Sequence, residues 1–148
     1  MKTQITQMSI RDYDAVVALW ESVDGIGLDL EDADSRAGVR SYLRRNRGMS
    51  FVARQGNKLV GAVLCGHDGR RGYLHHLAVA PDCRRKGIGR ALVGRCLVAL
   101  RAAGIRRCHI FVFGGNLKAQ RFWERIGWGG FRDLRIMSTN IPASAVRS

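Results

Sequence analysis

A short run of cationic and glycine residues, Arg84-x-x-Gly87-x-Gly89, has the chemistry of an anion-binding loop. It precedes a stretch with helical periodicity, and the first turn of a helix leaves backbone amides unpaired at the positive end of the helix dipole. The two glycines lack side chains that would keep a pyrophosphate away from those amides. Four cationic side chains surround the same place: Arg84, Arg85, Lys86 and Arg90. The pattern predicts a phosphate-binding loop, against the alternative of a glycine turn with solvated arginines.

The segments around this loop alternate between strand and helix patterns. Strands are predicted at residues 2–8, 49–55, 58–66, 73–80, 107–113 and 128–137, and Gly56-Asn57 is a hairpin signal between the second and third. Helices are predicted from Ser9, which opens a capping box with Asp12, and over residues 35–46, 87–103 and 116–126. The loop therefore lies between a strand and a helix in a single mixed α/β domain, residues 1–148, whose tail from about residue 139 is expected to fray.

Composition supports one globular domain and narrows the choice of partners. The chain of 148 residues is 46% hydrophobic and 25% charged, with no apolar run long enough to span a membrane. Its start lacks a signal region, so a cytoplasmic location is expected. The net charge of +13 is uneven, because residues 1–35 carry a balance of −6 and residues 36–148 one of +19. Such a field attracts polyanions, either a phosphorylated cofactor or nucleic acid.

Two segments carry a resemblance to a known family. The first runs Leu77-Ala78-Val79-Ala80-Pro81 and then Arg84-Arg85-Lys86-Gly87-Ile88-Gly89-Arg90-Ala91-Leu92, and the second is Asn116-x-x-Ala119-x-x-Phe122-x-x-x-x-Gly127-Trp128. Both resemble the signature blocks of the GNAT acetyltransferase superfamily, in the same order and on the same elements. The resemblance implies an α/β acyl-CoA N-acyltransferase fold: a mixed, mostly antiparallel central sheet with four helices and a splay between its fourth and fifth strands.

The resemblance also implies an acetyl-CoA site built mainly from backbone groups. The strand end Leu77-Ala78-Val79 would bind the acetyl carbonyl and the pantetheine arm, and the loop Arg84-Arg85-Lys86-Gly87-Ile88-Gly89-Arg90 would hold the pyrophosphate. Asn116 would contact the pantetheine from the far side. Trp123 stands where the family carries a tyrosine that protonates the departing thiolate, and it would line the pantetheine channel. An indole has no useful acidity, so that proton would come from Tyr73 or from water.

Acetyl transfer to an amine needs a base and a group that stabilises the oxyanion. The backbone amide of Leu77 is the expected stabiliser. Imidazole titrates near neutral pH, so His75 and His76 are the candidate bases. Successive strand residues face opposite sides, which predicts that only one of the two points into the cleft. His75 is preferred because it shares a face with Leu77 and Val79, and a structural histidine with water as the base is the alternative.

The acceptor side of the site is expected at an acidic loop. Five acids lie within residues 24–34, among them Asp29, Glu31 and Asp32. In the family, the connection between the first two helices covers the acceptor. The charge therefore favours a cationic amine, against the alternative of a solvated loop that neutralises nearby arginines.

The sequence thus predicts an N-acetyltransferase that moves the acetyl group of acetyl-CoA to a primary amine, by direct attack in a ternary complex and without a metal. It leaves room for a homodimer. The alternative is a weak or inactive relative that senses acetyl-CoA or uses its basic surface on nucleic acid. The interleaved aromatic and lysine side chains of a nucleic-acid platform are not evident, so nucleic acid is the less favoured partner.

Overall fold

The structure is a computed structural model that describes residues 2–143. The chain divides into two compact units, an N-terminal unit that ends at Asn116 and a C-terminal unit that begins at Leu117. The loop 84–90 and the two candidate bases all belong to the N-terminal unit. No helix formed by residues 2–143 is long and apolar enough to cross a membrane.

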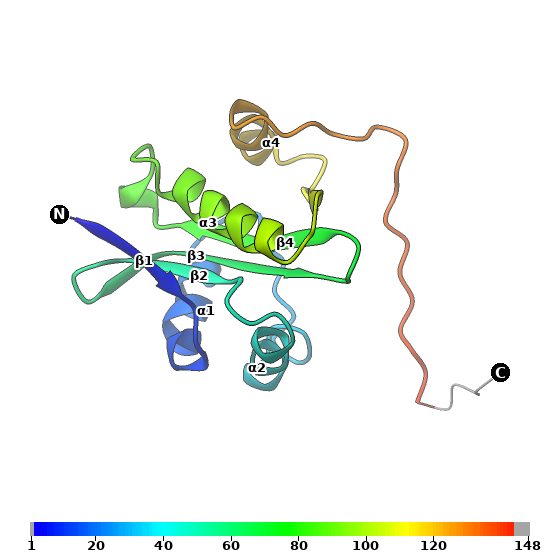
Figure 1. The fold of residues 1–148 in the computed structure, drawn as a ribbon, viewed down its shortest axis with the longest axis horizontal. Helices are drawn as coiled ribbons and strands as arrows, with labels where there is room; N and C mark the ends of the chain where they lie inside the picture. The colour runs from blue at the N-terminus through cyan, green and yellow to red at the C-terminus, as the bar shows by residue number, and fades with distance from the viewer. Residues whose placement is uncertain (1, 144–148) are drawn as a thin grey trace. The chain divides into compact units, whose positions relative to one another are not determined.

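A five-stranded sheet forms the centre of the N-terminal unit (Figure 1). Its strands lie in chain order: β1 (Thr3–Gln7), β2 (Phe51–Gln55), β3 (Lys58–His67), β4 (Gly72–Val79) and β5 (Cys108–Ile110). Neighbouring strands are antiparallel except for β4 and β5, which are parallel. Together with four α-helices in the described residues, this sheet confirms the predicted mixed, mostly antiparallel α/β class.

Helices cover both faces of this sheet. α1 (Tyr13–Glu21) and α2 (Arg36–Arg45) lie on one face, and α3 (Ile88–Ala102) lies on the other (Figure 1). Two glycines of β3 allow this close approach. A Cβ added at Gly61 would lie 3.0 Å from Leu92 of α3, and one added at Gly66 would lie 2.6 Å from the Tyr42 hydroxyl of α2. Gly61 therefore lies on the face of the sheet that α3 covers, and Gly66 lies on the face that α2 covers.

The predicted helix starts are confirmed by their caps. The amide of Ser9 donates to Oδ2 of Asp12 at 2.9 Å, which forms the capping box ahead of a 3-10 turn (Ile10–Asp12) and α1. Asp12 also pairs with Arg54 of β2. Ser35 caps α2, because its Oγ accepts from the Gly38 amide at 3.0 Å. These contacts fix the end of α2 that faces the acidic loop and tie the start of α1 to the sheet.

β4 and β5 pair over only three residues. Their ladder joins Gly72–Leu74 to Cys108–Ile110, whereas β4 continues to Val79. Among the described residues, the β5 side of β4 therefore has no ladder partner beyond Leu74. This confirms the predicted splay between the fourth and fifth strands.

Two predicted strands differ from the structure. The strand expected at 107–113 is shorter, because β5 ends at Ile110. The strand expected at 128–137 is wrong, since none of those residues joins a ladder. The apolar residues Phe131, Leu134 and Ile136 are spaced by three and two instead of alternating, and the preceding Gly129-Gly130 pair disfavours a strand.

The C-terminal unit contains α4 (Leu117–Arg125). Trp123 is buried in it, with its ring 4.7 Å from that of Trp128 and 5.2 Å from that of Phe122. The helix ends at a left-handed Gly127 (φ 99°), as predicted, and the Trp128 amide donates to the Trp123 carbonyl at 2.9 Å. Residues 144–148 of the tail that was expected to fray lie outside the described residues.

Candidate active site

The loop that precedes α3 has a backbone suited to an anion. Arg85 (φ 63°) and Gly87 (φ 79°) are both left-handed, and α3 begins at Ile88 without a side-chain cap. Left-handed residues next to right-handed ones turn successive N–H groups toward one concave side, an arrangement called a nest that binds anions. The first turn of the 15-residue α3 adds its own uncapped amides at the positive end of the helix dipole.

Exposed cations surround this concavity. The four side chains are Arg84, Arg85, Lys86 and Arg90. Among residues 2–143, no carboxylate lies within ion-pair distance of any of them, and the nearby Asp82 lies 3.7 Å from Lys58 instead. Arg84 makes one further contact, because its Nε donates to the carbonyl of Val79 at 3.3 Å. This bond ties the loop to the end of β4.

The end of β4 presents backbone groups on its open side. The Ala80 amide donates to the Val60 carbonyl at 2.8 Å, and Ala78 lies opposite Ala62 in the ladder with β3. In an antiparallel pair, alternate residues direct their N–H and C=O groups toward the same neighbour. Leu77 and Val79 therefore direct theirs away from β3, toward the side that β5 leaves open. The Leu77 backbone and the Val79 amide are placed to bind an extended ligand, while the Val79 carbonyl accepts from Arg84.

A bulge in β4 sits immediately before these residues. The ladder pairs Leu64 with His75 and then Ala62 with Ala78, so two residues of β4, His76 and Leu77, lie opposite the single residue between them on β3. His76 has φ 55°, a left-handed conformation that costs an L-residue about 1–2 kcal/mol. Bulges of this kind bend a strand and redirect its side chains.

The bulge overturns two expectations about the histidines. His75 lies on the face of Ala78, whereas Val79 pairs with Gly61 on the opposite face, so His75 and Val79 do not share a face. The extra residue shifts the alternation on which that expectation depended. The two imidazoles are also not separated by the pleat. Their ring centroids lie 6.4 Å apart, with His75 near Tyr42 of α2 and His76 near Trp20 of α1.

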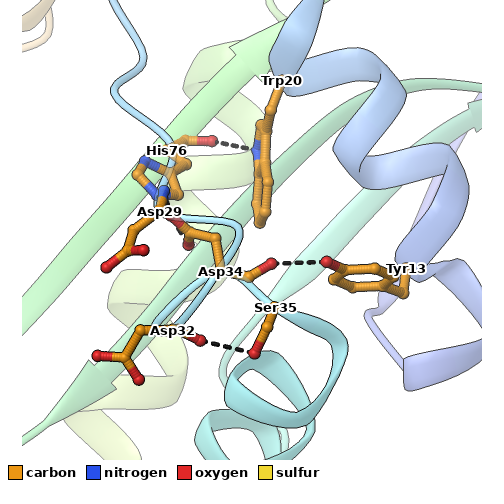
Figure 2. Close-up of polar contacts among 7 residues, drawn as sticks. All are labelled: Tyr13, Trp20, Asp29, Asp32, Asp34, Ser35 and His76. Atoms are coloured by element: carbon orange, nitrogen blue, oxygen red, sulfur yellow. Dashed lines mark hydrogen bonds and ion pairs between the residues drawn. The ribbon is translucent and has the colours of Figure 1, made fainter.

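His76 is held by residues from α1 and from the acidic loop (Figure 2). Its Nε2 lies 3.0 Å from Oδ1 and 3.1 Å from Oδ2 of Asp34, and its carbonyl accepts from Nε1 of Trp20 at 2.8 Å. Asp34 in turn accepts from the Asp29 amide at 2.9 Å, and its carbonyl accepts from the Tyr13 hydroxyl at 2.7 Å. These bonds connect the bulge directly to the loop between α1 and α2.

The carboxylate of Asp34 is kept ionised despite its burial. Its side chain is only 7% exposed. Burial by itself raises the pKa of Asp34, but hydrogen bonds from the His76 ring and the Asp29 amide outweigh that effect, so the pKa lies below its usual range. The Nε2 atom of His76 therefore faces a negatively charged carboxylate, that of Asp34.

His75 lies among aromatic rings. Its ring is stacked on that of Tyr73 at 6.4 Å and lies 6.2 Å from Tyr42 and 6.0 Å from Phe111. Burial lowers the pKa of His75, and the neighbouring His76 lowers it further, while Asp34 partly opposes both effects. Neither ring nitrogen of His75 has a hydrogen-bond partner among the described residues. A neutral imidazole with an available lone pair can accept a proton.

The acids of the acidic loop fall into two groups. Asp29, Glu31 and Asp32 are exposed, and Asp34 is buried in its pair with His76. The polar contacts of Asp29 and Asp32 in Figure 2 are made by the backbone, since the Asp32 carbonyl accepts from Ser35 Oγ at 2.6 Å. Asp34, the acid of this loop that is nearest to the candidate bases, is therefore already paired with His76.

The two remaining predicted residues lie in different units. Asn116 packs against the loop that follows α1, because a Cβ added at Gly25 would lie 2.4 Å from its Nδ2. Trp123 belongs to α4 of the C-terminal unit. Asp34 and Trp20 were missed by reasoning from sequence, since neither stands in a pattern that marks a site. In residues 2–143, no group of three His, Cys, Asp or Glu side chains is placed to hold a metal ion.

Comparison with known proteins decides the family. Residues 14–128 match the acetyltransferase (GNAT) family. The chain belongs to this family of acetyltransferases. It is 32% identical to an acetyltransferase of Pectobacterium atrosepticum over 115 residues, which cover 78% of this chain and 79% of that protein. An acetyltransferase of Sodalis glossinidius is 30% identical with the same coverage of both chains.

Solved structures of GNAT proteins share the fold. An acetyltransferase of Streptococcus agalactiae superimposes with a TM-score of 0.76 at 18% identity, covering 95% of this chain and 92% of that one. The PaiA N-acetyltransferase of Thermoplasma acidophilum, solved in complex with coenzyme A, gives a TM-score of 0.71 at 18% identity, with 84% and 88% coverage. The chain thus shares its fold with these two acetyltransferases.

Proposed function

We propose that this acetyltransferase moves the acetyl group of acetyl-CoA to a primary amine, by direct attack within a ternary complex. The observation that carries the proposal is that the loop 84–90 lies next to the open end of β4. A left-handed, cation-rich loop ends beside the open edge of β4, and the bond from Arg84 to the Val79 carbonyl joins them. A ligand with a pyrophosphate and an extended amide-containing arm matches this pair of features.

Binding of acetyl-CoA is assigned mainly to backbone groups. The amides of the loop from Arg84 to Arg90, through Gly87, Ile88 and Gly89, hold the pyrophosphate, and Arg85, Lys86 and Arg90 supply charge around it. Leu77 and Val79 of the strand end bind the pantetheine amides as an added strand would, whereas the backbone of Ala78 between them is directed toward β3. Asn116 and Trp123 are proposed to line the arm further along. No metal takes part.

The chemical step needs one proton removed and one delivered. The amine nitrogen attacks the thioester carbonyl, a C–N bond forms, and the Leu77 amide donates to the oxygen that becomes negative. His75 accepts the proton that the amine loses, either directly or through one water. The C–S bond then breaks, and the thiolate takes a proton from Tyr73 or from water, because Trp123 cannot supply one.

A second candidate is a relative that binds acetyl-CoA without efficient transfer. It is favoured by Trp123, since a buried indole that packs on Trp128 stands where the family places its acid. The loss of a general acid lowers the rate by about 100- to 10,000-fold. With Trp123 in this place, turnover would therefore be slow or too slow to detect.

Two measurements separate these candidates. Acetyl-CoA at 100 times its dissociation constant should stabilise the chain by about 2.7 kcal/mol, seen as a thermal shift. Release of free thiol in the presence of an amine panel reports transfer. No thermal shift at millimolar acetyl-CoA would contradict both candidates, and a shift without thiol release from any amine would support the sensor.

A further inference from the structure

A hollow lies beside His75 on the face of the sheet that carries α1 and α2. Its volume is about 220 Å³, and we name it the α2–β4 hollow after its lining, which includes Tyr42, Arg45, Gly66, Asp68, Tyr73 and His75. A water occupies about 30 Å³ of liquid, so the hollow has room for a group of about seven water volumes. That is the size of a small molecule or one side chain.

Tyr42, Tyr73 and His75 give the α2–β4 hollow three aromatic rings that also carry polar atoms. The rings of Tyr42 and Tyr73 lie 6.2 and 6.4 Å from that of His75. Among the described residues, neither phenol hydroxyl has a hydrogen-bond partner, so both are available to a ligand. Gly66 makes room for one of them, because a Cβ there would lie 2.6 Å from the Tyr42 hydroxyl.

The wall of the hollow is held in place by a buried amide. Asn46 is 5% exposed, and its Oδ1 accepts from the His67 amide at 3.1 Å while its Nδ2 donates to the Tyr42 carbonyl at 3.3 Å. These two bonds join the end of α2 to the end of β3. The hollow is therefore a fixed feature of the fold and not a gap between loose loops.

Arginines outnumber acids in the segments that line the hollow. Two charged side chains line it, Arg45 and Asp68. The carboxylate of Asp68 is engaged in its own turn, because its Oδ1 accepts from the amides of Arg70 and Arg71 at 2.8 Å each. Arg45 forms no ion pair with any residue among 2–143. Arg44 and Arg47 lie close to it in the chain, and Arg70 and Arg71 follow Asp68. An arginine without a carboxylate is suited to bind one in a bidentate pair.

We infer that the α2–β4 hollow binds the acceptor, and that the acceptor is a small primary amine that also carries a carboxylate. This inference rests on the proposed function, since it places the amine at His75 and the carboxylate at Arg45. Both residues line one hollow of limited volume, so the two groups are separated by only a few bonds, as in an amino acid. It differs from the cationic amine that the acidic loop suggested, because the acid nearest to His75 is paired with His76 and no acid of that loop lines the hollow.

The test compares amines that differ only in the carboxylate. Phenylalanine is paired with phenethylamine, and 4-aminobutyrate with butylamine, while putrescine represents a cationic acceptor. We expect kcat/KM for thiol release to be at least tenfold higher for the member with the carboxylate in one or both pairs. The substitution Arg45→Gln should abolish that difference. Arg44→Gln, one residue earlier on α2 and outside the hollow, should preserve it.

Binding is measured separately from turnover so that the two proposals can fail separately. In the chain saturated with coenzyme A, the preferred amino acid should raise the melting temperature, and Arg45→Gln should remove the rise without altering the shift caused by acetyl-CoA. A preference for putrescine, or a carboxylate preference that survives Arg45→Gln, would overturn the inference. An Arg45-dependent shift without thiol release from any amine would support the binding site and contradict the proposed transfer.

Discussion

Nε2 of His76 lies 3.0 Å from Oδ1 of Asp34, and this pair joins the bulge of β4 to the loop between α1 and α2. The two residues are 42 positions apart in the chain. Because His76 is left-handed at φ 55°, contacts from elsewhere must hold it, and Asp34 and Trp20 supply them. The peptide after His76 carries the amide of Leu77, so the pair helps to set the position of the proposed oxyanion stabiliser.

Replacing Asp34 by Asn should destabilise the fold. The change removes a charged acceptor that is buried and bonded to His76, and hydrogen bonds to charged groups contribute about 1.5–3 kcal/mol. We expect a loss of about 1–3 kcal/mol in the free energy of unfolding, measured by urea titration. Asp32→Asn, an exposed neighbour whose side chain lies in no ion pair with residues 2–143, should change it by less than about 0.5 kcal/mol. Equal midpoints for the two variants would show that the pair does not stabilise the fold.

The effect of Asp34 should depend on pH in one direction. Its pKa in the folded chain is lowered, so the folded state favours the charged form more than the unfolded state does. The stabilisation is therefore complete above the unfolded pKa of about 3.9, and it is lost as pH falls through the folded value. Unfolding of the wild type and Asp34→Asn at pH 7, 5 and 3 should give a difference that is constant at first and then shrinks. A difference that grows toward low pH would contradict this assignment.

His75→Gln should lower kcat/KM by about 100- to 10,000-fold while acetyl-CoA still causes its thermal shift. The pKa of His75 is lowered chiefly by burial, so the imidazole stays neutral to below its usual 6.5. The acidic limb of the wild-type pH profile should accordingly lie below pH 6.5, and the variant should lose that limb. A variant with unchanged rate and profile would show that water, and not His75, removes the proton.

Gly87→Ala should weaken binding of acetyl-CoA. Gly87 has φ 79°, and a left-handed conformation costs alanine about 1–2 kcal/mol, so the loop would relax away from the nest. We expect a several-fold higher dissociation constant by calorimetry. Gly94→Ala is the matched control, because Gly94 lies inside α3 with open space around its Cβ, and the change should stabilise the helix by about 0.5–1 kcal/mol. Equal affinities of the two variants for acetyl-CoA would show that the loop does not form part of the binding site.

The parts of the site that follow from residue type could be predicted from the sequence. The cationic glycine loop lies between β4 and α3, and Ser9 opens a capping box with its neighbour Asp12. Such signals are local, and the structure has each of them where the sequence places it. The splay was predicted only through family resemblance, since nothing local marks the residue where β5 leaves β4.

The bulge at His76 could not be predicted in the same way. Strict alternation along residues 73–80 placed His75 with Val79, and a histidine in the left-handed region is not indicated by its type. The contacts that favour this conformation come from Asp34 and from Trp20, which lies 56 positions away. A tertiary cause of this kind has no local signal. The wrong strand at 128–137 has a simpler origin, because its apolar residues do not keep a regular period of two.

The cysteines should react slowly in the folded chain, which matters for any assay that detects free thiol. Cys65, Cys83 and Cys96 are buried and Cys108 is half-buried, all without disulfides. Burial and the neighbouring Cys65 raise the pKa of Cys108 to about 12, and a hydrogen bond with Cys65 together with burial raises the pKa of Cys96. Since the thiolate is the reactive form, a disulfide reagent should modify far fewer than four thiols within minutes under native conditions, and all four in guanidinium. Rapid native reaction that disappears in Cys83→Ser would instead identify a reactive thiol beside the cationic loop.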